Sequence, residues 1–479
     1  MRSSILACAA TLLVACGTSS SPSSPTNSGG GGGGDDSGAV NPGDDAGNVT
    51  DGASADATVD SAFDAGPPDT TCSGPCPKSS IKHVVIIVQE NHTFDDHFGA
   101  YCTATPGSNP TCNDGPACCE AMPAADPKGV KPTVITDEEH ATFGPNHAKS
   151  CELTEIDNGK MDGFSNTSNI GCGSAENVAA ADPTIIKPYW DLAKTGALGD
   201  RYFQPLVGQS SGNDMYLARA AWVFDDNAAA PKGAVGMTCD LESPAQQYTD
   251  QTIGDLLTAA TVPWTWFSGG YGTMVAADGG CPPKPSDCAF ALSFYPCAYD
   301  PSDVPFNYYA SSRDNPANLQ DLSALDAILT GTGELPAVSF VKPIGYESEH
   351  PGASSTLSAG VTRVTGIIAA IEASKYRDDT LVILTYDEGG GYFDHVAPPA
   401  ASTIDSEPYG TRIPFLVVGP FARKNFVSHV TMEHSSLVKF IEWNWLGGTT
   451  GQLGTRDTVV ANIGSVLDPA TTGVAVPEN

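Results

Sequence analysis

The amino-acid sequence predicts an α/β fold, in which a mostly parallel sheet carries helices on both faces. Short apolar runs rich in β-branched residues are typical of strands buried on both faces, and they occur at 83–88, 337–341, 381–386 and 414–419, with a weaker example at 263–267. Helical periodicity occurs at 250–260, 317–329, 358–374 and 434–446. Because strands alternate with helices, parallel pairing is favoured, with helices covering both sides of the sheet.

The expected strands and helices also indicate where a functional site should lie. The first strand, HVVIIV, is almost continuously apolar, and AVSFV, LVILTY and PFLVVG have the same character further along the chain. The helix expected over 358–374 places Val361, Val364, Ile368 and Ile371 on one stripe. Ligands of open α/β sheets bind beyond the carboxyl ends of the strands, so we expect a site among the residues that follow these strands.

Charge excludes several classes of partner. The chain has 479 residues, with 23 Lys and Arg against 56 Asp and Glu, and a formal net charge of −33. Binding to nucleic acid requires a basic surface, and so does passive adhesion to anionic lipid headgroups, so neither is expected. Beyond the first sixteen residues the sequence contains no apolar run of about 18 residues, so we expect no transmembrane helix.

The N-terminal segment resembles a bacterial export signal. Residues 1–16 contain one positive charge, a short apolar stretch and the sequence Leu-Val-Ala-Cys, which is similar to a lipobox ending at Cys16. We therefore expect a lipoprotein signal peptide at 1–16 and lipidation of Cys16; cleavage as an ordinary secretory signal is the alternative. From the lipobox-like sequence we expect an exported, lipid-anchored protein that faces the periplasm or the cell surface. Gly17, the residue after the cysteine, favours anchoring in the outer membrane.

Residues 17–77 have the composition of a tether. Ser, Gly, Pro and Asp dominate, and Lys and Arg are absent, so the segment cannot bury enough apolar surface to offset its ordering entropy. Residues 78–479 are then predicted to form one folded domain.

The cysteines predict disulfide bonds. Fourteen are present, and setting aside Cys8 and Cys16 leaves twelve, all between Cys72 and Cys297. In an exported protein an even number indicates disulfides, here up to six, whose pairing the sequence does not determine. A zinc site is the rival interpretation, but the usual spacing of histidine ligands is missing.

Two strand ends carry oxygen ligands. Glu90 and Asn91 follow the first strand, and Asp387 and Glu388 follow the strand at 381–386. Three converging carboxylates would repel one another, and a divalent metal ion resolves that conflict by coordination. Each segment alone could equally be a helix cap or a turn. The two together, nearly 300 residues apart, favour a single metal site.

At these two segments the sequence resembles the bacterial phosphoesterase family of phospholipases C and acid phosphatases, which is related to the alkaline phosphatase superfamily. The ENxSFDxxxG motif of that family matches residues 90–99, with Thr93 in place of Ser. Its DExxGxxDHVxxP motif matches 387–399, and its GxRVP motif appears at 410–414. NGKMDGF at 158–164 and EHPG at 349–352 are similar to two further elements. The resemblance implies an alkaline-phosphatase-like core, onto which the cystines would staple insertions.

The nucleophile motif departs from the family. Where the family has TxPNR, this chain reads Ser210-Ser211-Gly212-Asn213-Asp214, so Ser210 aligns with the nucleophilic Thr. Ser211 is the fallback if the alignment slips by one residue. The serine version is more similar to the acid phosphatases than to the phospholipases C. A loop ending in a helix cap is the structural alternative, since a helix N-terminus can also hold phosphate oxygens.

These parts predict a hydrolysis through a phosphoserine. One divalent ion, held by Glu90, Asn91, Asp387 and Glu388, would lower the pKa of the nucleophile and neutralise a phosphoryl oxygen. All-oxygen ligation favours Ca²⁺, Mg²⁺ or Mn²⁺, and a histidine ligand would favour Zn²⁺. Histidines would donate to the phosphate or protonate the leaving group, and the motifs point to His147, His350 and His395.

We therefore predict a metal-dependent phosphoric ester hydrolase. An acid phosphatase acting on phosphate monoesters is the first choice, and a phospholipase C acting on phospholipids is the alternative. An anchored surface protein without activity is the alternative from another class. A sulfatase is disfavoured, because no C/S-x-P-x-R sequence follows Ser210.

Overall fold

The computed structural model describes residues 76–227, 248–276, 296–297, 299–313 and 315–479, all within one compact unit, Asp64–Asn479. The predicted signal peptide, Cys16 and all but the last two residues of the predicted tether lie outside the described residues. Among the described residues, no helix is both long and apolar enough to cross a bilayer.

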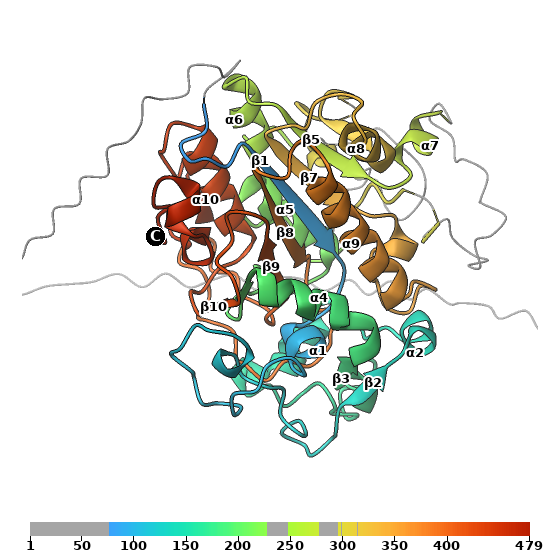
Figure 1. Ribbon diagram of the computed structural model, residues 1–479. Coiled ribbons are helices and arrows are strands. Elements are labelled where there is room, and N and C mark those ends of the chain that lie inside the picture. Colours follow the sequence, from blue (N-terminus) through green and yellow to red (C-terminus); the bar gives the residue numbers. More distant parts are fainter. Residues whose placement is uncertain (1–75, 228–247, 277–295, 298, 314) are drawn as a thin grey trace, which may run out of the picture. The chain divides into compact units, whose positions relative to one another are not determined.

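An eight-stranded sheet forms the centre of the unit, in the order β10-β4-β9-β8-β1-β7-β5-β6. Its strands are β1 (His83–Gln89), β4 (Ala197–Gly199), β5 (Trp264–Ser268), β6 (Leu319–Asp321), β7 (Val338–Lys342), β8 (Thr380–Tyr386), β9 (Phe415–Val418) and β10 (Phe426–Ser428). β1 pairs in parallel with β7 and β8, and the three lie side by side in Figure 1. Only β9 among these eight runs antiparallel, against β8 and β4. The predicted mostly parallel sheet is thus confirmed.

Helices cover both faces of the sheet, as the sequence predicts. In β1, alternate side chains point to opposite faces, so Val84 and Ile86 join one apolar core while Val85 and Ile87 join the other. The first core includes side chains of α5 (Ser210–Arg219), α6 (Ile253–Ala259) and α10 (His434–Trp445). The second includes side chains of α1 (Phe94–Phe98), α4 (Pro183–Thr195), α8 (Leu322–Leu329) and α9 (Leu357–Ala373).

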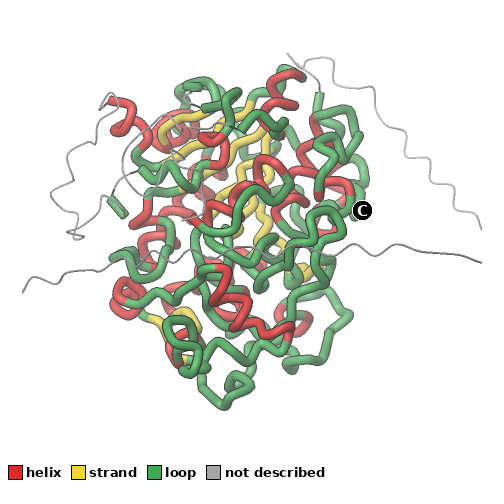
Figure 2. The backbone as a smooth tube through the Cα atoms, turned by 180° about the vertical axis from the view of Figure 1, so that it is seen from behind, coloured by secondary structure: helices red, strands yellow, loops and turns green. Residues whose placement is uncertain are grey.

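The segment between α1 and α4 is an insertion at the carboxyl end of β1. It contains α2 (Asp137–Thr142), α3 (Lys149–Ile156) and a two-stranded sheet of β2 (Thr133–Ile135) and β3 (Ala179–Ala181), but loops make up most of it (Figure 2).

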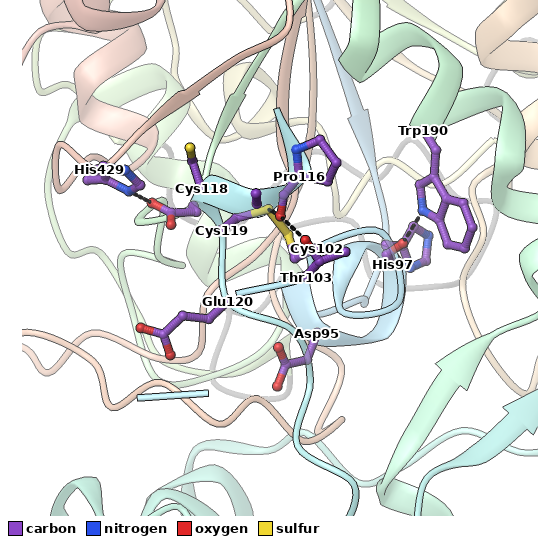
Figure 3. Close-up of a disulfide and its surroundings, with 12 residues drawn as sticks. Asp95, His97, Cys102, Thr103, Pro116, Cys118, Cys119, Glu120, Trp190 and His429 are labelled. Atoms are coloured by element: carbon purple, nitrogen blue, oxygen red, sulfur yellow. Dashed lines mark hydrogen bonds and ion pairs between the residues drawn. A yellow bond between two sulfur atoms is a disulfide. The ribbon is translucent and has the colours of Figure 1, made fainter. Parts of the chain in front are cut away.

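Disulfides hold this insertion together. The bonds Cys102–Cys119, Cys112–Cys118 and Cys151–Cys172 all lie within it. Around the first of them, the Thr103 hydroxyl donates to the carbonyl of Pro116, and the Trp190 indole of α4 donates to the carbonyl of His97 in α1 (Figure 3). The cystines therefore staple an insertion beside the sheet, which confirms that part of the predicted fold.

Candidate active site

Two turns that are nearly 300 residues apart in the sequence meet at the carboxyl edge of the sheet. They follow the neighbouring strands β1 and β8, and the Asp387 carboxylate joins them. Its Oδ1 accepts hydrogen bonds from the backbone N–H groups of Asn91 (3.0 Å) and Glu388 (2.7 Å). The close approach of the two turns requires glycine at position 390, because a Cβ there would lie 2.2 Å from the carbonyl oxygen of Asn91. The structure thus brings together the segments of the four predicted metal ligands.

Asn91 lies at the centre of this arrangement. Its φ of 66° is left-handed, a conformation that Asn adopts more readily than most residues. Its side-chain oxygen accepts a hydrogen bond from Ser210 Oγ at 3.4 Å, and its Nδ2 lies 3.2 Å from His147 Nε2. The predicted nucleophile and one predicted catalytic histidine therefore contact the same predicted metal ligand.

Ser210 is the first residue of α5 and is buried. Its neighbour Ser211 faces another group, since Ser211 Oγ donates to Asp303 Oδ1 at 3.2 Å. The contact of Ser210 with Asn91 is what favours it as the nucleophile over the fallback, Ser211.

His147 is held in one tautomer. Its Nδ1 lies 3.0 Å from the carbonyl of Pro145, so this nitrogen carries the proton and donates it. Nε2 then keeps its lone pair, which accepts from Asn91. Burial, followed by the neighbouring His350, lowers the pKa of His147 to about 4, so the ring is neutral near pH 7. The two rings pack edge to face with centroids 5.9 Å apart.

The donor set fits a divalent cation. Glu388 Oε1 is buried and has no hydrogen-bond partner, and it lies 3.6 Å from His147 Nε2. Burial raises the pKa of Glu388 well above its ordinary range, and Glu152 and Asp387 raise it further. Burial likewise raises the pKa of Glu90 to about 7, against the opposing effect of Lys342. An unpartnered carboxylate oxygen beside other oxygen donors is the environment in which Ca²⁺, Mg²⁺ or Mn²⁺ binds.

A buried lysine that our sequence reasoning missed joins the same cluster. Lys342 Nζ lies 3.5 Å from Glu90, 3.4 Å from Asp387 and 3.7 Å from Asp214. Burial alone would lower the pKa of Lys342, but the three carboxylates raise it well above its ordinary value. A signal was available: Lys342 directly follows the apolar run at 337–341, so it stands at the strand end where polar side chains were sought.

His395 makes a different set of contacts from those expected of a catalytic residue. Its Nδ1 pairs with Asp95 at 2.7 Å, and its Nε2 lies 3.0 Å from Glu120. Asp95 and Glu120 are seen beside the cystine in Figure 3. Within the described part of the chain, no hydrogen bond or ion pair joins His395 to Ser210 or Asn91. Both ring nitrogens are engaged by carboxylates, so the contacts favour a structural role.

Two compact groups of potential metal ligands lie outside the predicted set. The ligand atoms of each group fall within 4.8 Å of one another, and the groups are His92, Asp96 and His97, and Asp95, Asp394 and His395. Arg412 pairs with Asp95 and Asp394 at 2.9 Å each, which already compensates the second group. Among the described residues, the three carboxylates of the predicted set, Glu90, Asp387 and Glu388, do not form such a compact group.

Ser210 at the start of α5 thus lies against Asn91 at the carboxyl edge of the sheet, which is where open α/β sheets bind their ligands. Residues 81–446 match the Phosphoesterase family, and the chain belongs to that family. The protein is accordingly a phosphoester hydrolase, which sets aside the anchored protein without activity.

Several curated relatives are phospholipases C. Phospholipase C B of Mycobacterium tuberculosis is 26% identical over 464 residues, covering 83% of this chain and 80% of that protein. Non-hemolytic phospholipase C of Pseudomonas aeruginosa is 24% identical, covering 76% of this chain and 53% of that protein. Among solved structures, a protein in the alkaline phosphatase superfamily from Vibrio parahaemolyticus aligns with a TM-score of 0.35 and 12% identity, covering 82% of this chain and 74% of that one.

Proposed function

We propose that the protein is a metal-dependent phospholipase C in which Ser210 is the nucleophile. The relatives that cover most of this chain carry that name, so they favour phospholipase C over the acid phosphatase that the sequence alone ranked first. The observation that carries the proposal is the hydrogen bond from Ser210 Oγ to Asn91 Oδ1, at the meeting point of the two metal-ligand turns.

In the proposed reaction Ser210 Oγ attacks the phosphorus of a phospholipid. The bond from phosphorus to the glycerol oxygen breaks, diacylglycerol leaves, and the phosphorylated headgroup stays attached to the serine. Water then attacks phosphorus, releasing the phosphorylated headgroup and restoring the hydroxyl. A divalent ion held by Glu90, Asn91, Asp387 and Glu388 would supply a Lewis acid that stabilises charge on the phosphoryl oxygens.

The histidines have distinct roles in this proposal. His147 is neutral, and its Nε2 lone pair lies in the site, where it accepts from Asn91. In the proposal this nitrogen takes up the proton of Ser210 and passes it to the leaving oxygen. His350 packs edge to face against His147 and in this proposal helps to orient that ring. His395 is left out of the chemical steps because its ring nitrogens bind Asp95 and Glu120.

The substrate class is tested by comparing two substrates. Purified protein is assayed on phosphatidylcholine vesicles and on p-nitrophenyl phosphate, each with and without a chelator. We expect phosphocholine release with the larger kcat/KM, and loss of both activities on chelation. Efficient hydrolysis of p-nitrophenyl phosphate alone would establish the acid phosphatase, which the Ser210-Ser211 element favours. Full activity after complete metal removal would contradict the metal site.

We also propose that the protein is exported and anchored through a lipid on Cys16. The support is the lipobox-like sequence before Cys16 and the tether composition of residues 17–77. A Cys16→Ala variant should lose incorporation of labelled palmitate and shift from the membrane fraction to the soluble fraction. Unchanged labelling of that variant would refute the anchor.

A further inference from the structure

Lys342 occupies a position at the site that the hydrolytic chemistry does not use. It is the last residue of β7, next to β1 in the sheet, and its side chain is only 5% exposed. Its Nζ lies within 3.4–3.7 Å of carboxylates from three separate elements: Glu90 after β1, Asp387 after β8, and Asp214 in α5. A strand residue is a rigid support, so this ammonium group has a fixed place in the site.

Negative charge exceeds positive charge around this group. Asp303 is also buried, and Ser211 donates to it at 3.2 Å. Both carboxylate oxygens of Asp214 are buried and have no hydrogen-bond partner, so the ion pair with Lys342 is their main compensation in the described structure. A buried carboxylate without hydrogen bonds is stabilised as an anion only by a cation close by, and otherwise it takes up a proton.

We propose that Lys342 is a positioning residue whose ammonium group takes the place of a second divalent ion and so limits the metal centre to one. The proposal rests on the metal site of the proposed function. A divalent ion would hold carboxylate oxygens at roughly 2.0–2.6 Å, closer than the ammonium does here, and two such ions typically lie about 3.5–4 Å apart in hydrolytic centres. Asp387 contacts Lys342 and is also a predicted ligand of the first ion, so it stands where a bridging ligand would stand.

The proposal predicts that removing the ammonium group opens a second metal site. Full-length protein is equilibrated with Mn²⁺ and desalted, and the bound metal is measured by inductively coupled plasma mass spectrometry. Wild type should retain one Mn²⁺ per chain and Lys342→Ala should retain two. The matched control is Lys439→Ala, which removes a lysine of α10 that is also buried but donates to the carbonyl of Val460. That control should retain one Mn²⁺.

Thermal stability provides the second readout. In chelator, Lys342→Ala should melt well below wild type, because its carboxylates have lost their cation, and excess Mn²⁺ should restore the Tm. Adding Asp214→Asn should also recover part of the Tm in chelator, since one buried negative charge is removed along with the positive one. If Lys342→Ala does not fold in chelator, refolding with Mn²⁺ should rescue it.

The outcomes separate the two proposals. Wild type that binds no Mn²⁺ would contradict the metal centre itself, and the Lys342 proposal with it. Wild type with one Mn²⁺, together with a folded Lys342→Ala that also binds one at unchanged affinity, would overturn the role of Lys342 alone. Failure of Mn²⁺ to rescue refolding of Lys342→Ala would overturn it as well.

Discussion

Asn91 shows how a single residue can define the geometry of this site. Its left-handed backbone turns the chain out of β1, so that its N–H faces Asp387 while its side chain reaches Ser210 and His147. The polar residue types after the strand were a sufficient signal to select Asn91 from the sequence. Its role as the residue that joins nucleophile and histidine was not predictable, because Ser210 and His147 come from distant parts of the chain.

Ser210 and Ser211 give a sharp test, since the two hydroxyls are neighbours with different partners. Ser210→Ala removes the attacking oxygen and should lower kcat by about 10³-fold or more. Ser211→Ala removes only a hydrogen bond to Asp303 and should keep activity within about tenfold of wild type. Steady-state kinetics on phosphatidylcholine measures both. If Ser211→Ala loses the activity and Ser210→Ala keeps it, the nucleophile is Ser211.

At the scale of elements, α9 supports the site through Gly360. A Cβ at Gly360 would lie 2.1 Å from Glu349 Cγ. Glu349 accepts hydrogen bonds from Tyr189 and Tyr386 and precedes His350 in the chain. Gly360→Ala should therefore displace Glu349 and with it His350, costing on the order of 1–3 kcal/mol of stability and much of the activity.

Gly366 in the same helix is the control. No atom lies within 4 Å of an added Cβ there, so Gly366→Ala should stabilise the protein by about 0.5–1 kcal/mol with unchanged kcat. Chemical denaturation and kinetics report both quantities. If Gly360→Ala and Gly366→Ala changed stability and kcat equally, the contact with Glu349 could not be the cause of the losses in Gly360→Ala.

α3 carries a carboxyl group that makes stability depend on pH. Burial raises the pKa of Glu155 from 4.5 to about 8, although Asn177 donates to it. Because of this raised pKa, the folded state holds the proton of Glu155 more tightly than the unfolded state does. The stabilisation that results is fully present below about pH 4.5 and is lost as the pH rises through about 8.

As the pH rises from about 4.5 to about 8, Glu155→Gln should therefore lose less stability than wild type. Glutamine cannot ionise, and its side-chain oxygen still accepts the hydrogen bond from Asn177. Scanning fluorimetry from pH 4 to 9 measures the Tm of both proteins, with the exposed Glu138→Gln as control. Parallel Tm curves for wild type and Glu155→Gln would show that Glu155 does not ionise in this range.

The elements that were predictable are those with long apolar patterns. β1, β7, β8 and β9 and helices α9 and α10 lie within a few residues of their expected ranges, because buried strands and amphipathic helices leave strong periodic signals. β4 and β10 were missed, since three residues are too few to show a period. The antiparallel direction of β9 was missed too, because strand direction depends on long-range pairing.

At the scale of the molecule, we expect the three cystines of the insertion to stabilise the insertion and not the central sheet. Cys151–Cys172 closes a loop of 21 residues around α3. A Cys151→Ala/Cys172→Ala variant should lose roughly 3 kcal/mol from the insertion by the loop-entropy estimate. In hydrogen exchange, amides of 149–172 should exchange faster while those of β1 and β8 stay protected. Equal loss of protection in β8 would show that the sheet depends on this bond.

The contacts of His395 could not be predicted from the sequence. Its motif places it eight residues after Asp387, but the chain carries it to Asp95 and Glu120 instead of Ser210. Glu120 lies in the insertion, whose path follows from the cystine pairing, and that pairing was not deducible from the sequence.

The metal position is tested most directly by crystals grown with Mn²⁺ and measured by anomalous diffraction. We predict one anomalous peak, roughly 2.0–2.6 Å from oxygens of Glu90, Asn91, Asp387 and Glu388, with Ser210 Oγ facing it. A peak at the group of His92, Asp96 and His97 instead, or none between the two turns, would contradict the proposed active site.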